Sequence, residues 1–132
     1  MPSPVFPLEH AKKYVEEDSM SITYPGVMAA TASIQDKPFL ELSKKSNDIA
    51  RGIMTSVLDE IKQTYLPTQT NFIFHKLKVP LEEYQKAMKE KHIIVGRVFP
   101  PAEGWCRVSF GTPGEMLYVA KSMRELHAQG LV

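Results

Sequence analysis

The stretch over 105–116 constrains the fold of this chain most, because it joins a strand directly to the start of a helix. Its first half places a single arginine, Arg107, among apolar residues and ends at a glycine, which predicts a strand over 105–110. Its second half begins Thr-Pro-x-Glu at Thr112, the pattern of a helix N-cap with a capping box and a proline in the first turn. A helix over 113–129 is therefore expected after the strand.

Arg107 is the first candidate for chemistry in this stretch. A charged side chain within an apolar strand is costly to bury unless it meets a partner or faces solvent. Its planar guanidinium group can hold a carboxylate through two parallel hydrogen bonds. The residue therefore indicates an acid-binding site, and an outward arginine on an edge strand is the alternative.

Composition narrows the function classes. The chain has 132 residues, the size of one domain, and its formal net charge of +1 gives no reason to expect nucleic acid or an anionic membrane as a partner. Its apolar runs are too short to cross a bilayer, and its first residues lack the pattern of a signal peptide. The single cysteine, Cys106, cannot form an internal disulfide and fits a reducing compartment. We therefore expect a cytoplasmic protein with no membrane partner.

Outside the stretch over 105–116, the sequence predicts several helices and two more strands. Residues 1–20 differ from the rest of the chain, with a proline-rich start and a short helical stretch over 8–17. The residues over 27–34 are small or apolar on every side, which indicates a helix buried against something large. Further helices are expected over 39–64 and 81–91, and strands over 70–77 and 92–97.

This order of elements predicts an α+β fold. We expect a small three- to four-stranded antiparallel or mixed sheet with helices packed on one face, preceded by a long interrupted helix. The strands over 92–97 and 105–110 are expected to pair as a hairpin across the proline-containing loop between them. The helix over 39–64 should face the core with a stripe of apolar residues: Leu42, Ile49, Ile53, Val57 and Ile61.

Three runs of this sequence resemble a known family. They are Asn71-Phe72-Ile73-Phe74, the run from Ile93 to Pro100, and the run from Cys106 to Pro113. Together they are similar to the C-terminal small domain of fold-type I pyridoxal-phosphate aminotransferases, in particular the histidinol-phosphate aminotransferase-like group. The stretch from Tyr24 to Asp36 resembles the passage from the large to the small domain of that family. By this resemblance, residues 1–20 are a linker or a remnant of the large domain, and 21–132 form the small domain.

The resemblance implies roles for three residues. The arginine at the position of Arg107 binds the carboxylate of the amino-acid or keto-acid substrate in such enzymes, and the asparagine corresponding to Asn71 lies near that site. The arginine corresponding to Arg97 helps to recognise the substrate in the histidinol-phosphate-like branch. As alternatives, Arg97 is a surface arginine at the end of a strand, and Asn71 closes a turn with its side chain.

The cofactor-binding part of the family's site is missing from this sequence. The Schiff-base lysine of the family stands in a Ser-Lys-x-aromatic-Gly context. The single Ser-Lys pair here, Ser43-Lys44, is followed by neither an aromatic residue nor a glycine, which is typical of a solvated helix face. We therefore expect pyridoxal phosphate in the intact enzyme, none bound to this chain alone, no catalytic residue in the chain and no transamination by it in isolation.

Two other kinds of site have less support in the sequence. Cys106 could act as a nucleophile with His75 or His92, but it alternates with its neighbours along a strand and is expected to be a small core residue. The four histidines of the chain lack the spacing of metal ligands, so no metal site is expected.

A second function class remains open. It is a non-enzymatic module of ferredoxin-like α+β fold, which binds a small ligand or docks on a protein through the apolar helix over 27–34. That helix should drive self-association or docking under either reading. A truncated reading frame, a separately expressed domain, a processed piece of a longer enzyme and a natural stand-alone domain all fit the sequence.

Overall fold

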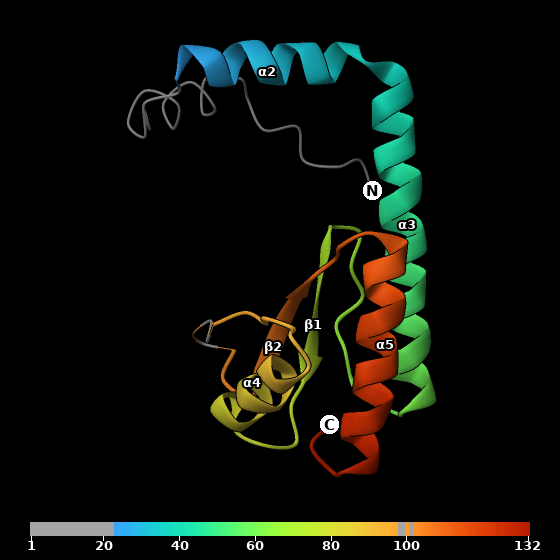
Figure 1. The fold of residues 1–132 in the computed structure, drawn as a ribbon, viewed down its shortest axis with the longest axis vertical. Helices are drawn as coiled ribbons and strands as arrows, with labels where there is room; N and C mark the ends of the chain where they lie inside the picture. Colours follow the sequence, from blue (N-terminus) through green and yellow to red (C-terminus); the bar gives the residue numbers. More distant parts are fainter. Residues whose placement is uncertain (1–22, 98–99, 101) are drawn as a thin grey trace, which may run out of the picture. The chain divides into compact units, whose positions relative to one another are not determined.

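The computed structural model describes residues 23–97, 100 and 102–132. The described elements follow the order α2 (Tyr24–Gln35), α3 (Lys37–Glu60), β1 (Phe72–Lys76), α4 (Leu81–Glu90), β2 (Trp105–Ser109) and α5 (Pro113–Ala128) (Figure 1). The chain divides into two compact units, one ending at Leu40 and the other over Glu41–Val132. The α+β class is confirmed. The expected helix over 8–17 and the segment 1–20 lie outside the described residues.

The sheet consists of β1 and β2, which pair antiparallel. Ile73 pairs with Val108 and His75 with Cys106, and these four side chains are buried. The side chains between them alternate to the other face of the sheet, where Phe74 pairs with Arg107. In the described part of the chain the sheet is therefore smaller than the three or four strands expected from the sequence.

The expected strand over 92–97 is the missing one, and its hairpin with 105–110 was wrongly predicted. His92 has a positive φ of 57° at the end of α4, and the Ile93 N–H group donates to the carbonyl of Met88, so the start of this segment is tied to the helix. Gly96 further along has no side chain to pack. A backbone hydrogen bond from Gly96 N to Arg107 O, at 3.2 Å, joins the segment to β2 without making it a strand.

The core lies on the Ile73 face of the sheet. Tyr84 of α4 contacts the buried His75, which places this helix on that face. The helices α3, α4 and α5 bury side chains in one cluster with it, as predicted for helices packed on one face. The buried residues of the three helices are Ala50, Met54, Val57, Leu58, Tyr84, Met88, Met116, Val119, Ala120, Ser122, Met123 and Leu126.

The apolar residues of α3 that were expected to face the core are only partly buried. Val57 and, just after the helix, Ile61 are buried, but the side chains of Leu42 and Ile49 are 66% and 46% exposed. The buried positions of the helix begin at Ala50, so its first half does not enter the core. The apolar period of a sequence marks a helix face, and it does not tell how far along the helix a core extends.

α2 is a helix as predicted, but its expected burial is not found in this structure. Thr23 caps it, with its Oγ1 accepting from Gly26 N at 3.3 Å. None of its residues is buried, and the exposed fractions of Tyr24 and Ile34 reach 76% and 69%. Within the described residues the chain has no helix long and apolar enough to cross a membrane.

His75 is a titratable group inside the core. Its Nδ1 donates to the Lys76 carbonyl at 3.3 Å, so that its Nε2 accepts from the Tyr84 hydroxyl at 3.3 Å. The two rings also meet edge to face, with centroids 5.4 Å apart. Burial lowers the pKa of His75 from 6.5 to about 4, because a charged imidazolium would lose its hydration there.

The first prediction follows from that pKa. Between about pH 6.5 and pH 4 the unfolded chain binds a proton at His75 that the folded chain does not, so the free energy of unfolding falls as the pH is lowered through this window. We expect a loss of about 2 kcal/mol between pH 8 and pH 5 from this residue, measured by urea denaturation.

His75→Asn should flatten that pH dependence, and His92→Asn is the matched control. His92 is exposed, and asparagine accepts its positive φ, so the control should keep the pH dependence. An equally steep fall in the His75 variant would contradict the prediction.

Candidate functional site

Arg107 lies on the outward face of β2 and is half-buried. Its Cζ atom is 5.3 Å from the centroid of the Phe72 ring on β1. A guanidinium group over an aromatic face is held by the negative charge density of the ring, and this contact uses none of its N–H donors. The sheet therefore supplies an oriented cation next to an apolar surface, a combination that suits a carboxylate ligand.

Cys106 is a core residue, as predicted. Its side chain is buried on the opposite face from Arg107, and this burial raises the pKa of the thiol to about 12, against a smaller lowering by the Gly96 backbone. The thiol stays protonated at neutral pH and is not a nucleophile there. Among the described residues, no cluster of three or more His, Cys, Asp or Glu side chains could hold a metal ion.

Asn71 stands directly before β1 and is exposed. Its carbonyl accepts from Phe110 N at 2.8 Å, which joins the start of β1 to the residue after β2. It borders an open cleft of about 520 Å³ between α3, the start of β1 and the start of α5. The residues that line this cleft are Leu42, Ser43, Ser46, Asn47, Asn71, Phe110, Gly111 and Thr112.

Gly111 and Thr112, which line this cleft, lie at the start of α5, where the predicted capping box is confirmed. Thr112 Oγ1 accepts from Glu115 N at 3.3 Å, and Thr112 N donates to Glu115 Oε2 at 2.7 Å. The Glu115 carboxylate accepts from Thr112 N and, at 2.9 Å, from Thr112 Oγ1, and these two hydrogen bonds, the backbone one first, lower the pKa of the carboxyl below its usual value. A Cβ at Gly111 would meet the same carboxylate oxygen, so a larger residue there would displace the Glu115 side chain.

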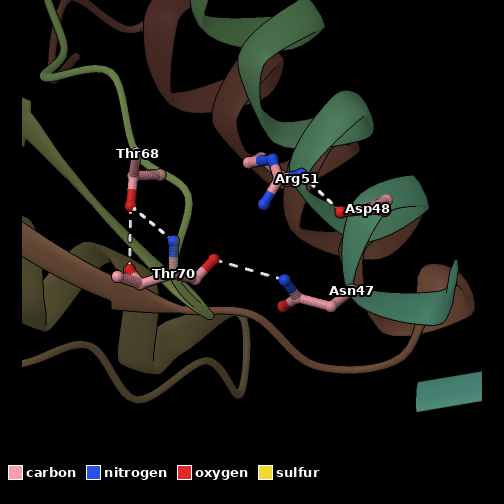
Figure 2. Close-up of polar contacts among 5 residues, drawn as sticks. All are labelled: Asn47, Asp48, Arg51, Thr68 and Thr70. Atoms are coloured by element: carbon pink, nitrogen blue, oxygen red, sulfur yellow. Dashed lines mark hydrogen bonds and ion pairs between the residues drawn. The ribbon is translucent and has the colours of Figure 1, made fainter. Parts of the chain in front are cut away.

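Asn47 ties α3 to the loop before β1 (Figure 2). Its Nδ2 donates to the Thr70 carbonyl at 3.2 Å, and Thr70 in turn contacts Thr68, with 2.8 Å between the two hydroxyl oxygens. One turn further along α3, Arg51 forms an ion pair with Asp48. The sequence did not single out Asn47. A pattern of nearby residues could not have revealed its contact with Thr70, because the two residues are 23 positions apart in the chain.

Of the three expected site residues, all of them described, Asn71 lines this cleft and neither Arg97 nor Arg107 does. Arg97 is exposed, at the end of the segment that contacts β2 through Gly96. Arg107 lies on the outward face of the sheet, and Asn71 borders the cleft at its end. Asn71 directly precedes Phe72, the residue whose ring Arg107 faces.

Several named proteins are similar to this chain in sequence, although no family model matches it. A histidinol-phosphate aminotransferase from Brevibacillus brevis is 28% identical over 123 residues, which cover 90% of this chain and 32% of the relative. Histidinol-phosphate aminotransferase 1 from Bacillus cereus is 31% identical over 99 residues, covering 74% of this chain and 26% of the relative.

Solved protein structures show a similar resemblance to this chain. A "putative histidinol-phosphate aminotransferase" from Erwinia carotovora atroseptica has a TM-score of 0.77 and 48% identity, covering 81% of this chain and 31% of that protein. Histidinol-phosphate aminotransferase from Sinorhizobium meliloti, solved with pyridoxal 5'-phosphate, has a TM-score of 0.65 and shares the fold at 23% identity, covering 79% of this chain and 30% of that one. The expected resemblance to these aminotransferases is confirmed. The chain spans about a third of the relatives it matches.

The cleft at Asn71 does not by itself fit pyridoxal phosphate. An aminotransferase holds this cofactor through a Schiff-base lysine and a partner for the pyridine nitrogen. No lysine lines the cleft at Asn71, and Lys44, the lysine of the Ser-Lys pair, is exposed on α3.

The hydrogen bond from Asn47 of α3 to the Thr70 carbonyl can be tested by substitution. Asn47→Ala removes the hydrogen bond to the Thr70 carbonyl and should lower the free energy of unfolding by about 1 kcal/mol in urea denaturation. Ser43→Ala, in the same cleft and on the same helix, is the control and should change it by less than about 0.5 kcal/mol. Equal effects of the two variants would mean that Asn47 does not fasten the loop.

Proposed function

We propose that this chain, with its likeness to histidinol-phosphate aminotransferases, is the C-terminal small domain of such an enzyme and binds the substrate carboxylate through Arg107. The observation that carries the proposal is the half-buried guanidinium of Arg107, held over the Phe72 ring on the outward face of the sheet. A carboxylate approaching that face gains two charge-assisted hydrogen bonds in one plane. The apolar ring beside it raises the strength of those bonds by keeping water away.

The other two candidates have supporting parts in this proposal. Asn71 lies beside Phe72 and offers an amide donor and acceptor to polar groups of the substrate near Arg107. Arg97 offers a second cation, suited to an additional anionic group of the substrate, such as a phosphate. The substrate class is therefore an amino acid or a keto acid, with the group beyond its carboxylate and amine left open.

The small domain is proposed to close over the substrate. Closure would bring Arg107 to the reacting centre and exclude water from it. Pyridoxal phosphate supplies the electron sink for amino-group transfer when it is bound. Because the cleft at Asn71 offers this cofactor no lysine, the remaining part of the enzyme is proposed to hold it, and the chain alone is proposed to be inactive.

The exposed apolar side chains of α2 fit the same proposal. Tyr24, Met28 and Ile34 would be covered by the rest of the enzyme or by a second copy of the chain. The ferredoxin-like module has less support, because a ferredoxin-like sheet has four strands and the described residues form two.

A domain replacement tests the role of Arg107. In the Erwinia carotovora protein, the third of the sequence that matches this chain is exchanged for it, and the rate of amino transfer from histidinol phosphate is measured. Arg107→Ala should lower kcat/KM by about 10²-fold, since two charge-assisted hydrogen bonds are lost. Arg107→Lys should recover part of it, because the charge remains and the paired geometry does not.

Arg124→Ala is the matched control for these variants. Arg124 is an exposed arginine of α5 whose Nε lies 2.9 Å from Glu60 Oε1, and loss of such a surface pair costs little. A chimera that keeps its activity in the Arg107→Ala variant would overturn the proposed role. An inactive chimera would remove support for the whole assignment.

A second experiment addresses the cofactor. The purified chain is mixed with pyridoxal phosphate and reduced with borohydride, and the products are mapped by mass spectrometry. We expect scattered adducts on exposed lysines or none, because no lysine lines the described cleft at Asn71. One stoichiometric adduct at a single lysine would contradict the proposal that the cofactor is held elsewhere.

A further inference from the structure

Gly96 lies in close contact with the backbone of Arg107. Its N–H group donates to the Arg107 carbonyl at 3.2 Å. A Cβ atom on Gly96 would lie 2.7 Å from that oxygen, closer than a side chain tolerates. The segment 93–97 can therefore approach β2 at this point only with a glycine.

Gln85 of α4 holds the other side of Gly96. Its Nε2 donates to the Gly96 carbonyl at 2.9 Å, in a partly buried hydrogen bond. The helix that carries Gln85 is itself fixed, because the neighbouring Tyr84 and, one turn on, Met88 are fully buried in the core. The position of Gly96 is thus set from the core through α4.

The same contact bears on both arginines of the proposed site. Arg107 lies on β2 directly at the Gly96 contact, and Arg97 comes directly after Gly96 in the chain. β1 pairs along one edge of β2, and within the described residues no second strand pairs along the other, so the Gly96 contact supports the edge that the sheet leaves open. Phe72 orients the guanidinium of Arg107, and Gly96 supports its backbone.

We propose that Gln85 and Gly96 are positioning residues, which hold Arg97 and Arg107 in register with each other through one hydrogen-bonded glycine. The importance of this positioning for the enzyme rests on the proposed function. The positioning itself does not depend on bound substrate and is present in the chain alone. It makes α4 the element that sets the spacing of the two cations.

The test is NMR on the full chain labelled with ¹⁵N. Gln85→Met keeps the size of the side chain and removes the donor, and Gly96→Ala adds the clashing Cβ. In both variants the Arg107 Nε–Hε resonance should move, because the ring current of Phe72 acts on a displaced guanidinium. In Gln85→Met, exchange of the backbone amide at position 96 should accelerate about tenfold.

Gln85→Lys restores a donor and should return the Arg107 resonance toward its original position. Gly52→Ala is the matched glycine control, because a Cβ there meets nothing within 4 Å in the middle of α3, and it should leave the resonance in place. Circular dichroism verifies the fold of each variant. If Gly96→Ala does not fold, the Gln85 variants carry the test.

An unmoved Arg107 resonance and unchanged amide exchange in folded Gln85→Met would overturn the positioning role. The two proposals fail separately. A moved resonance together with a domain-replacement chimera that does not need Arg107 would overturn the carboxylate site and leave the positioning role standing.

Discussion

The pairing of β1 with β2 is the constraint on which the rest of the structure depends. It joins two segments that are distant in the chain, and its register decides which side chains share a face. His75 and Cys106 enter the core together, and Phe74 and Arg107 leave it together. A shift of one residue would bury the guanidinium and expose the core, so the register is fixed by the cost of desolvating a charge as much as by packing.

Local signals in the sequence predicted local structure well. The cap of α5 at Thr112 and the inward direction of Cys106 each depend on residues a few positions apart, and both were confirmed. The strand predicted over 92–97 was wrong because its apolar, β-branched residues carry no information about hydrogen-bonding partners. Its first residues complete the end of α4, and Gly96 then makes a contact that only a glycine permits.

In the candidate site, too, local features could be predicted from the sequence and long-range contacts could not. Arg107 could be selected from the sequence because an arginine in an apolar strand needs solvent or a partner to offset the cost of burying its charge. That its guanidinium faces Phe72 follows from a register which no single segment contains. Asn47 could not be selected, since its partner is a backbone carbonyl, and backbone atoms leave no trace in the residue pattern. Contacts to the main chain across long sequence separations are what a single sequence conceals.

The cap of α5 also occupies the place where an anion from solution would otherwise bind to the helix. Helix N-termini attract anions because their free N–H groups and the helix dipole carry partial positive charge. Here the Glu115 carboxylate already accepts from Thr112 N, and its lowered pKa keeps it ionised at neutral pH. A fixed negative charge therefore lies where the helix N-terminus would otherwise attract an anion. The chain thus fills this helix N-terminus with a carboxylate of its own, and the N-terminus of α5 is closed to an anion from solution.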